Sequence, residues 1–516
     1  MKKFELALVI LMVAISLAFT GCKGTTPAGP AQLTVEVFDR GTDGGKSLAY
    51  DNAWTDWIKE KVLTDLNIKV TFVPVGRWSE NIDIVNLMAS GTAPDLCYTY
   101  ALEMIANFRD QGGILDLAPY IDSYLPDLKK LLGEDTALQG KEFIYRQADP
   151  QTGSIYSIQS YRVSLAERNF FIRKDWLDKL GLPLPTNIQE FHDALIAFRD
   201  QDPGNVGRNR VVPYGQNEDT RWGLQDLINH SVNPNMSDRD RWVNNVAERF
   251  LLYPGYKEGV RMANQWYNER LIYQDFPLMT VADNFYNQMR SGVVGSFSQN
   301  WDLPYRQDYK INEELAINVP GAEFVPVDIV RNKLMYDKGG LYIFIPSFSK
   351  NHEAALRYLN WLAKPENFHF IQVGQEGVNH TIVNGVPNVT GRPAGDPWFM
   401  NSSNNIDYTM PINGVELGST ELNVRVLALS YGNIPADTIV NAYTLSTRNA
   451  RARPVYQVPT RVNQYAQTLQ DKSMALHAQA ITARPADFDR IWEAGIADWL
   501  ASGAQEVLNE RASLWK

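Results

Sequence analysis

Aromatic, arginine and aspartate side chains recur just after segments of this sequence that read as β-strands. Asp39 and Arg40 directly follow one such segment, and Tyr98 and Tyr100 end another. Aromatic faces pack against apolar C–H surfaces, whereas the planar polar groups of aspartate and arginine accept and donate hydrogen bonds. In open α/β sheets, bound molecules lie at the carboxyl ends of the strands. This combination suits noncovalent recognition of a polyhydroxylated compound such as a sugar.

Two tryptophans in loop-forming sequence extend this set. Trp222 and Trp398 lie in stretches rich in Gly, Pro and Asn, so we expect both to contact the bound compound. A purely structural role is the alternative for every residue in the set: a solvated ion pair in a turn for Asp39 and Arg40, alternation on a half-buried strand for the tyrosines, and loop packing for the tryptophans. With 13 Trp and 24 Tyr in the chain, most aromatics must fill the core or the surface.

Signatures of catalysis are absent from the sequence. There is no Gly-x-Ser-x-Gly elbow, no His-Glu-x-x-His, no phosphate-binding glycine loop and no Cys/His metal spacing. Six histidines leave zinc chemistry few ligands. The paired carboxylates Asp238/Asp240 and Asp487/Asp489 suit the solvated start of a helix better than an acid/base pair. We therefore expect a protein that is not an enzyme and has no metal and no cofactor.

The first 21 residues are typical of a signal peptide. Lys2 and Lys3 precede an apolar run over residues 6–19, which is too short to span a membrane. Phe19-Thr20-Gly21-Cys22 resembles a lipobox, so we expect cleavage before Cys22 and acylation of its thiol, although Phe19 stands where a lipobox usually has Leu. An ordinary secretory signal beside an unrelated cysteine is the alternative.

The segment that follows reads as a lipidated tether over residues 22–32, because small residues, Pro and Gly dominate it. Cys97 is the second of two cysteines, so acylation of Cys22 would leave no disulfide within the chain. Cys97 lies in an apolar stretch and is expected to pack in a strand. No other apolar run approaches eighteen residues, so we expect no membrane-spanning helix.

Length and charge limit the partners. A chain of 516 residues exceeds the ~250 residues at which single cores stop growing, so two lobes are expected. Removal of residues 1–21 changes the formal net charge from −10 to −11. An acidic surface disfavours nucleic acid as a partner. We expect a monomer held at a membrane by its N-terminal lipid.

The alternation of strand-like and helix-like segments indicates a parallel sheet flanked by helices. A βαβαβ unit is expected at the start, with strands over residues 33–38, 68–73 and 96–100 and the first helix over 52–66. Ile82, Val85 and Ala89 lie on one face of the second helix.

Further elements are expected along the rest of the chain. They are a strand over residues 170–173, a helix over 175–180 that ends at Gly181, a helix opened by a capping box at Thr186 and Gln189, and a strand over 341–346 that is buried on both faces.

Several of these pieces, in order, resemble the family 1 extracellular solute-binding proteins, the class that includes maltose-binding and alginate-oligosaccharide-binding proteins. The matching stretches are Ser-Gly-Thr-Ala-Pro-Asp-Leu (residues 90–96), Gly-Ile-Leu-Asp-Leu-Ala-Pro-Tyr-Ile (113–121), Ile-Arg-Lys-Asp-Trp-Leu-Asp-Lys-Leu-Gly-Leu (172–182) with Pro185 and Thr186, Ser-Gly-Val-Val-Gly (291–295), Ser-Lys-Asn-His-Glu-Ala-Ala (349–355) and Gly-Gln-Glu-Gly-Val-Asn-His (374–380). Each stretch is weakly specific alone, but their shared order extends over nearly the whole mature chain.

The resemblance implies an α/β fold of the periplasmic-binding-protein type, with two lobes, a hinge and an interlobe cleft that closes on the bound compound. By analogy, the chain crosses between the lobes near Ser160, Pro320 and Val373. The N-terminal lobe then comprises residues 33–160 and 321–372, and the C-terminal lobe residues 161–320 and 373–516.

The resemblance also assigns roles to residues. Asp39 and Arg40 occupy the position that holds sugar hydroxyls in relatives, and Tyr161 and Arg162 lie at the implied hinge. Trp301, with the acceptor Asp302 beside it, stands where relatives stack a sugar ring on a tryptophan.

One stretch departs from the family pattern. Lipoprotein relatives often carry a calcium-like loop that ends Asp-Glu-Ile-Pro, but in the matching residues 202–213 Arg210 and Val211 replace the carboxylates. Calcium takes six to eight oxygen ligands, so we expect no calcium here.

The expected function is an extracytoplasmic lipoprotein that captures a sugar or oligosaccharide and delivers it to the permease subunits of an ABC importer. A protein that presents its ligand to a membrane sensor and a secreted carbohydrate-active enzyme are the alternatives. Arg40, Arg162 and Arg221 permit an acidic sugar without requiring one.

Overall fold

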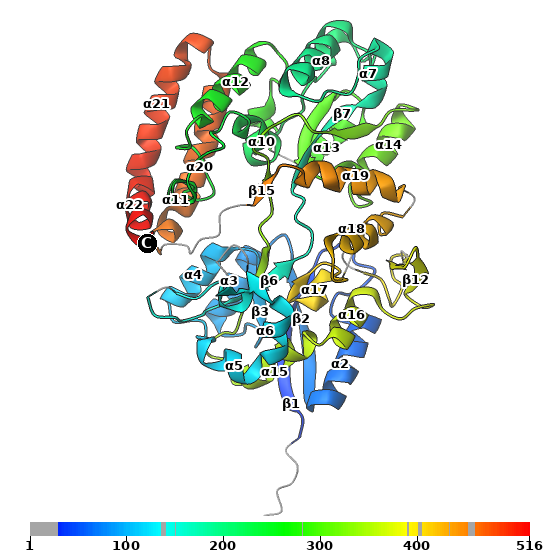
Figure 1. Ribbon diagram of the computed structural model, residues 1–516, viewed down its shortest axis with the longest axis vertical. Coiled ribbons are helices and arrows are strands. Elements are labelled where there is room, and N and C mark those ends of the chain that lie inside the picture. Colours follow the sequence, from blue (N-terminus) through cyan, green and yellow to red (C-terminus); the bar gives the residue numbers. More distant parts are fainter. Residues whose placement is uncertain are drawn as a thin grey trace, which may run out of the picture.

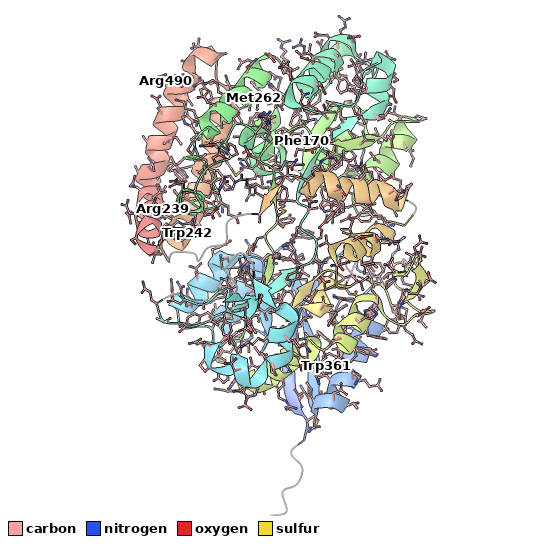
Figure 2. All side chains as sticks on the ribbon, viewed as in Figure 1. Phe170, Arg239, Trp242, Met262, Trp361 and Arg490 are labelled. Atoms are coloured by element: carbon pink, nitrogen blue, oxygen red, sulfur yellow. The ribbon has the colours of Figure 1, made fainter. Side chains whose placement is uncertain are left out.

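In the computed structural model, the chain forms two α/β lobes stacked along the long axis of the molecule (Figure 1). The structure describes residues 29–135, 141–149, 151–280, 282–389, 392–400, 405–432, 434–452 and 460–515. Trp361 lies in the lower, N-terminal lobe, and Phe170 and Met262 lie in the upper, C-terminal lobe (Figure 2). The expected two-lobed fold is confirmed, whereas the predicted signal peptide and Cys22 lie outside the described residues.

The N-terminal lobe begins with the predicted βαβ unit. β1 (Ala31–Asp39) and β2 (Ile68–Gly76) pair in parallel over their whole length, and α2 (Ala53–Leu66) connects them. Asn52 begins α2 with a capping box, in which its side chain accepts hydrogen bonds from two backbone N–H groups of the first turn. These contacts align the carboxyl ends of β1 and β2 at one edge.

A four-stranded sheet completes this lobe in the order β14-β6-β11-β3. The strands are β3 (Cys97–Thr99), β6 (Ile158–Arg162), β11 (Gly339–Phe344) and β14 (Ile412–Asn413). β6 leads into the C-terminal lobe, β11 returns from it and β14 leads out again. The three crossings of the chain therefore run as hydrogen-bonded neighbours.

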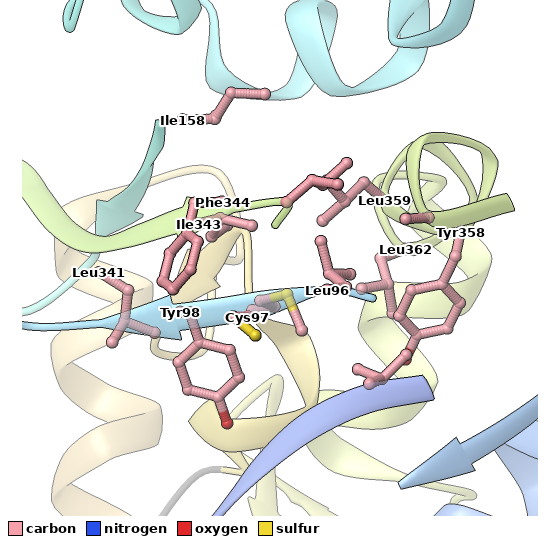
Figure 3. Close-up of a cluster of buried hydrophobic side chains, with 14 of the residues drawn as sticks. Leu96, Cys97, Tyr98, Ile158, Leu341, Ile343, Phe344, Tyr358, Leu359 and Leu362 are labelled. Carbon is pink, nitrogen blue, oxygen red and sulfur yellow. The ribbon is translucent and has the colours of Figure 1, made fainter. Parts of the chain in front are cut away.

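Apolar side chains of these strands form the core of the N-terminal lobe (Figure 3). Leu341, Ile343 and Phe344 of β11 lie close to Cys97 of β3, and α15 (His352–Leu362) covers the cluster. Cys97 is a buried free thiol, and burial raises its pKa. It is therefore a packed strand residue, as expected.

The helix α3 (Glu80–Ser90) is rotated relative to the expected orientation. Ile82 and Val85 are 61% and 43% exposed, whereas Ile84 and Glu80 are buried. The Glu80 carboxylate accepts hydrogen bonds of 3.0 and 3.1 Å from two groups at the end of β3. The rotation of the helix therefore places a carboxylate, rather than the apolar stripe, beneath that strand.

The C-terminal lobe is built around β7 (Arg168–Arg173), which lies between β8 (Ser296–Asn300) and β9 (Phe324–Val327) in an antiparallel sheet. The helix α7 (Lys174–Leu180) follows β7 directly and ends at Gly181, whose φ of 65° is left-handed, as predicted. The buried Phe170 and Ile172 of β7 face the helices that cover the sheet.

The next helix, α8 (Ile188–Gln201), begins one residue away from the predicted cap. Asn187 has extended backbone angles, and its side chain accepts hydrogen bonds from the N–H groups of Gln189 and Glu190. Glu190 in turn binds Thr186. Asn187 is therefore the cap, and the predicted pairing of Thr186 with Gln189 is wrong.

The remaining elements surround these sheets. Those of the N-terminal lobe are α4 (Leu102–Asp110), η1 (Ala118–Tyr120), α5 (Ile121–Tyr124), α6 (Pro126–Leu132), β4 (Glu134–Asp135), β5 (Lys141–Glu142), η3 (Phe143–Tyr145), α16 (Pro365–Val373), α17 (Ile406–Thr409) and the hairpin of β12 (His380–Val383) and β13 (Val386–Val389). Those of the C-terminal lobe are η4 (Arg208–Arg210), α9 (Thr220–Gly223), α10 (Gln225–Asn229), α11 (Asp238–Val243), α12 (Tyr256–Asn268), η5 (Phe276–Leu278), α13 (Ala282–Arg290), η6 (Leu303–Tyr305), α14 (Ile311–Asn318), α18 (Thr420–Leu429), α19 (Ala436–Thr447), α20 (Thr460–Thr482), η7 (Pro485–Asp487), α21 (Phe488–Trp499), η8 (Leu500–Ala504), α22 (Gln505–Leu514) and the short pair β10 (Leu334–Met335) and β15 (Arg451–Ala452). Among the described residues, no helix has the length and apolar character needed to cross a membrane.

The packing of the two cores differs from the expected lobe boundaries at residues 320 and 373. Val327 and Val330 pack in the core of the C-terminal lobe, because β9 completes the sheet around β7. Tyr408 and Met410 pack in the core of the N-terminal lobe, because β14 pairs with β6. The chain therefore returns to the N-terminal lobe after Val330 and leaves it again after β14.

The close packing of the crossing strands can be tested at Gly340 of β11. A Cβ there would lie 2.4 Å from Oγ of Ser160 on β6, and that hydroxyl accepts a 2.7 Å hydrogen bond from the N–H of Leu341. We expect Gly340→Ala to lower the free energy of unfolding by about 1 to 3 kcal/mol, because the methyl group overpacks this site. Urea unfolding measures the effect. Gly29→Ala is the control, because its Cβ meets nothing within 4 Å, and equal stability of the two variants would contradict the packing.

Candidate functional site

Arg77, Trp78 and Tyr100 form a group at the carboxyl edge of the N-terminal-lobe strands. The guanidinium carbon of Arg77 lies 4.3 Å from the centre of the Tyr100 ring and 5.1 Å from that of Trp78. Arg77 also pairs with Glu80 at 3.0 Å, and this contact fixes its position. The Trp78 side chain is 70% exposed. The edge therefore offers an open aromatic face beside a fixed cation.

Arg162 joins this group from the end of β6. Its guanidinium carbon lies 4.3 Å from the centre of the Tyr336 ring and 6.0 Å from that of Tyr100. Asn413, the partner of Arg162 on β14, donates a 3.2 Å hydrogen bond to the Tyr100 hydroxyl. Tyr336 lies on the returning segment, where its N–H binds the carbonyl of Leu165. The crossing thus brings together two of the predicted residues, Tyr100 and Arg162.

Tyr161 lies apart from its neighbour Arg162, because successive side chains of a strand point to opposite faces. Its ring packs edge-on against Phe143 at 5.9 Å, within the N-terminal lobe. Burial raises the pKa of its hydroxyl. The two predicted hinge residues are therefore separated, and Tyr161 belongs to the packing of its own lobe.

Arg40 and Asp39 are engaged within the N-terminal lobe. Arg40 binds the carboxylate of Asp407 through two hydrogen bonds of 2.7 Å, and both side chains are largely buried. Burial lowers the pKa of Arg40, but the carboxylate of Asp407 outweighs it and keeps that pKa above its ordinary value. Asp39 accepts a hydrogen bond from the N–H of Gly41 in its own turn. In place of the predicted sugar contact, Arg40 joins the end of β1 to α17.

Tyr98 is also a core residue, contrary to the prediction. It is 0% exposed, and its ring lies among the side chains of the apolar cluster (Figure 3). Its hydroxyl accepts a hydrogen bond from the N–H of Phe38 and donates one to the carbonyl of Asp407. Because β3 ends at Thr99, the chain turns and carries Tyr100 away from this core. Tyr100, and not Tyr98, therefore lies at the carboxyl edge of the N-terminal-lobe strands.

A hollow of about 360 Å³ lies in the C-terminal lobe. Its lining comprises Arg168, Arg221, Trp222, Gln225, Glu248 and Phe250. The guanidinium carbon of Arg168 lies 5.7 Å from the centre of the Trp222 ring. Arg168 is the first residue of β7, so the hollow begins where the chain enters this lobe from β6. Trp222 is thereby placed in a concave surface near the crossing.

The two arginines of the hollow are compensated by carboxylates. Arg168 pairs with Glu167 at 3.1 Å and with Asp226 at 3.2 Å, and all three side chains are buried. Arg221 pairs with Asp219 at 2.6 Å. These pairs hold the guanidinium groups in place around Trp222 without leaving an excess of positive charge.

The two lobes approach each other beside this hollow. Glu103, at the start of α4 in the N-terminal lobe, is exposed, yet its pKa is raised. The surrounding protein desolvates its carboxylate, and the charges of Glu248 in the opposite lobe and of Glu80 add to the shift.

Trp301 and Asp302 lie in the core of the C-terminal lobe, which overturns the prediction made for them. Trp301 is 7% exposed, and its ring packs edge-on against Tyr443 and Tyr431 at 5.5 and 6.2 Å. Asp302 accepts a 2.5 Å hydrogen bond from the Tyr431 hydroxyl, and burial raises its pKa. The helices α18 and α19 contribute apolar side chains to this core.

Trp398 serves the packing of its loop. Its ring lies edge-on to Trp54 at 4.8 Å, and its carbonyl accepts a hydrogen bond from the Trp54 indole. It lies with Phe370 of α16 at the side of the N-terminal lobe. The geometry therefore favours loop packing for Trp398 over contact with a bound compound.

The loop from residue 202 to 213 is closed by its own backbone. The two carboxylate oxygens of Asp202 accept hydrogen bonds from the N–H groups of Val206 and Gly207. In the part of the chain that the structure describes, no group of three or more His, Cys, Asp or Glu side chains could hold a metal ion.

A second, mostly apolar hollow of about 460 Å³ lies between the crossing segments and α18. Val163, Gly414 and Val415 line it together with Val424 and Leu427 of α18. Its polar lining residues are Ser164, Asn423, Ser430 and Tyr443, and no charged side chain lines it, so we place the candidate site at the edge of Trp78 and the hollow of Trp222 rather than here.

Sequence reasoning missed Arg77, Trp78 and Tyr336. Arg77 and Trp78 directly follow β2, so the rule that selected Asp39 and Tyr100 after their strands would also have selected them. No signal of that kind marks Tyr336, because it lies in a crossing segment whose position depends on the whole fold.

The chain is similar to known proteins over most of its length. The model of the bacterial extracellular solute-binding protein family matches residues 46–367. The polygalacturonan/rhamnogalacturonan-binding protein YtcQ of Bacillus subtilis is 21% identical over 406 residues, which are 73% of this chain and 74% of YtcQ. The fructooligosaccharide ABC transporter substrate-binding protein FusA of Streptococcus pneumoniae is 29% identical over 211 residues, which are 37% of this chain and 36% of FusA.

Solved structures share the fold. The alginate-binding protein AlgQ2 without calcium ion superimposes with a TM-score of 0.64 and 20% identity, over 93% of this chain and 97% of AlgQ2. A solute-binding protein of Bifidobacterium longum infantis, associated with an HMO-binding ABC transporter, gives a TM-score of 0.63 and 17% identity over 94% of this chain and 98% of its own. At these identities the likeness establishes the two-lobed architecture.

The burial of Trp301 has a measurable consequence. We expect Trp301→Ala to lower the free energy of unfolding by about 3 to 5 kcal/mol, since this is the usual cost of truncating a buried tryptophan. Trp78→Ala removes an equally large ring from an exposed position and should change stability by no more than about 0.5 kcal/mol. Denaturant unfolding compares the two. A Trp301→Ala protein as stable as Trp78→Ala would show that Trp301 lies outside the core.

Proposed function

We propose that this chain, which belongs to the bacterial extracellular solute-binding protein family, captures a sugar or oligosaccharide between its lobes and delivers it to an ABC importer. The proposal rests on two groups of aromatic and polar side chains near the crossing, one on each lobe. Trp78, Tyr100 and Arg77 stand on one lobe, and Trp222 and its hollow stand on the other.

The chemistry of the two groups suits a sugar. The exposed face of Trp78 can pack on the C–H surface of a pyranose ring, and Arg77 beside it can donate to ring hydroxyls. On the opposite lobe, Trp222 lies beside Gln225 and Glu248, which donate to and accept from hydroxyl groups. A ligand held by both groups would favour the closed arrangement of the lobes, because it gains contacts with each.

The named relatives support a carbohydrate ligand. Polygalacturonan, rhamnogalacturonan and fructooligosaccharides appear in the names of YtcQ and FusA, and FusA is named as an ABC transporter component. The permease subunits of such an importer are the proposed partners, and they would recognise the closed form. We further propose that the protein acts as a monomer without nucleic acid.

Binding without catalysis is part of the proposal. The carboxylates of Asp487 and Asp489, which the sequence offers as a pair, are both engaged in exposed ion pairs. Arg484 and Arg490 bind Asp487, and Arg261 and Lys257 bind Asp489. These contacts lower the pKa values of both carboxyls, which suits neither a general acid nor a shared proton.

An N-terminal lipid is the proposed anchor. The lipobox-like sequence before Cys22 supports acylation, and residues 22–32 would then tether the lobes to the cell membrane on its outer side. The lipoprotein LipO of Bacillus subtilis is 26% identical over 228 residues, which agrees with this assignment.

The role of Trp78 in the site can be tested by calorimetry. We expect Trp78→Ala to weaken binding of an oligosaccharide, identified by a thermal-shift screen of neutral and uronic sugars, by about 1 to 3 kcal/mol, the range for an aromatic contact at a hot spot. Trp515→Ala is the control, since it removes a tryptophan that is 40% exposed and packs on Trp242 at the end of α22. Unchanged affinity of Trp78→Ala would remove this side chain from the site. A folded protein that binds no carbohydrate in the screen would refute the proposed function.

The anchor has a separate test. Cys22→Ala should leave the protein unacylated, so it should move from the detergent phase to the aqueous phase in Triton X-114 partitioning of cell extracts. Metabolic labelling with a fatty acid provides the direct control. If the variant and the original protein partition alike, the lipid anchor is wrong, and the proposed sugar binding is unaffected.

A further inference from the structure

Arg162, at the end of β6, forms no ion pair with a carboxylate among the described residues. Five arginines in the same part of the molecule are paired with acidic side chains: Arg40 with Asp407, Arg77 with Glu80, Arg146 with Asp337, Arg168 with Asp226 and Arg221 with Asp219. The internal segments outside the described residues contain no aspartate or glutamate in the sequence. Within the part of the chain that the structure describes, no carboxylate therefore lies within ion-pairing distance of Arg162.

The environment of Arg162 is only partly open to solvent. Its side chain is half-buried, and its Nε atom is buried without a hydrogen-bond partner. The rings of Tyr336 and Tyr100 lie against its guanidinium group, and such rings stabilise a cation but accept no strong hydrogen bond through their faces. A partly desolvated charge without an opposite charge is unfavourable, and a bound anion relieves that cost.

The two rings also restrict the guanidinium group. Tyr336 is fixed by its backbone hydrogen bond to Leu165, and Tyr100 is fixed by Asn413 and by the stacked cation of Arg77. A guanidinium group held against aromatic faces presents its N–H groups in one plane. Planar, paired donors match the two oxygens of a carboxylate.

We propose that Arg162 binds a carboxylate of the ligand, so that the captured oligosaccharide carries uronic acid residues. This inference rests on the proposed function and names the class of sugar within it. The carboxylate takes the place of the missing protein partner of Arg162, while Trp78 and Trp222 contact the sugar rings.

Charge elsewhere in the cleft limits where an acidic group can lie. Burial raises the pKa of Glu103 in the N-terminal lobe, and the charges of Glu248 in the C-terminal lobe and of Glu80 add to that shift. A ligand carboxylate near these three side chains would be repelled. The acidic group is therefore placed at the end of the cleft that contains Arg162, and a sugar unit beside Glu248 is expected to present only hydroxyls.

The test compares acidic oligosaccharides with their neutral counterparts by isothermal titration calorimetry. The probes are trigalacturonate and a mixed mannuronate–guluronate trimer, each alongside its carboxyl-reduced form, in which the carboxylate becomes a hydroxymethyl group. We expect at least one uronate to bind about 10 to 100 times more tightly than its reduced form, the range for hydrogen bonds to a charged group. The preference should weaken as salt concentration rises.

Variants of Arg162 test whether this residue causes the preference for uronates over their carboxyl-reduced forms. Arg162→Met should abolish the preference for the uronate while leaving affinity for the reduced form within about threefold. Arg162→Lys should restore part of it, because the charge is kept and the paired donors are lost. Arg239→Met is the matched control: it removes the same charge from the exposed surface of α11, where Arg239 lies 3.4 Å from Asp240, and should behave as the original protein.

Three results would contradict the proposed role of Arg162, and they differ in what they imply for the proposed function. An equal loss of affinity for acidic and reduced forms in Arg162→Met would mean that Arg162 acts only by packing, which contradicts the inference. Tight binding of neutral or sulfated oligosaccharides in preference to uronates would overturn the inference and leave the proposed function standing. Failure to bind any member of a broad carbohydrate panel would overturn both.

Discussion

The architecture depends on the pairing of three crossing segments as adjacent strands of one sheet. β6 leads to the C-terminal lobe, β11 returns and β14 leads out again, and each is hydrogen-bonded to its neighbour in the order β14-β6-β11. The two lobes are therefore joined through a small sheet instead of through separate linkers. The hydrogen bonds between these strands fix the side chains at the strand ends relative to one another. Arg162 and Asn413 are such side chains.

The buried Arg40–Asp407 pair secures that sheet to the rest of the N-terminal lobe. Asp407 lies on α17, directly before β14, and it binds Arg40 at the end of β1 through two hydrogen bonds. The Tyr98 hydroxyl adds a contact to the Asp407 carbonyl. A pair of this kind is costly to break, because either partner alone would be a buried charge. Arg40 and Tyr98 therefore hold the edge in place, and Arg77, Tyr100 and Arg162 are the side chains that the edge presents.

Local sequence patterns predicted the helices and strands well, but they did not predict which distant strands pair with one another. The βαβ start followed from alternating strands and a capped helix, and the end of α7 at Gly181 followed from glycine chemistry. The lobe boundaries could not be derived in this way, because β9 and β14 are assigned to their lobes by pairing with β7 and β6, which lie far away in the sequence.

The candidate site shows the same limit. Trp301 and Trp78 both follow a strand, and nothing in their local sequence distinguishes them. Trp301 is covered by Tyr431 and Tyr443 from the C-terminal half of the chain, whereas nothing comparable covers Trp78, which is 70% exposed. The orientation of α3, with Glu80 inward and Ile82 outward, likewise depends on two hydrogen-bond donors at the end of β3. Burial of this kind is a property of the tertiary structure.

The central claim, that a sugar is held between two lobes that close around it, is tested most directly by a distance between them. Spin labels at Lys69 in the N-terminal lobe and Glu313 in the C-terminal lobe would be attached through introduced cysteines, since both positions are exposed and the native Cys97 is buried. Double electron–electron resonance would then report the separation with and without a saturating oligosaccharide. The account predicts that the distance distribution narrows and shifts when the sugar binds, and that the original distribution returns when it is removed. Saturable binding with an unchanged distribution would contradict it.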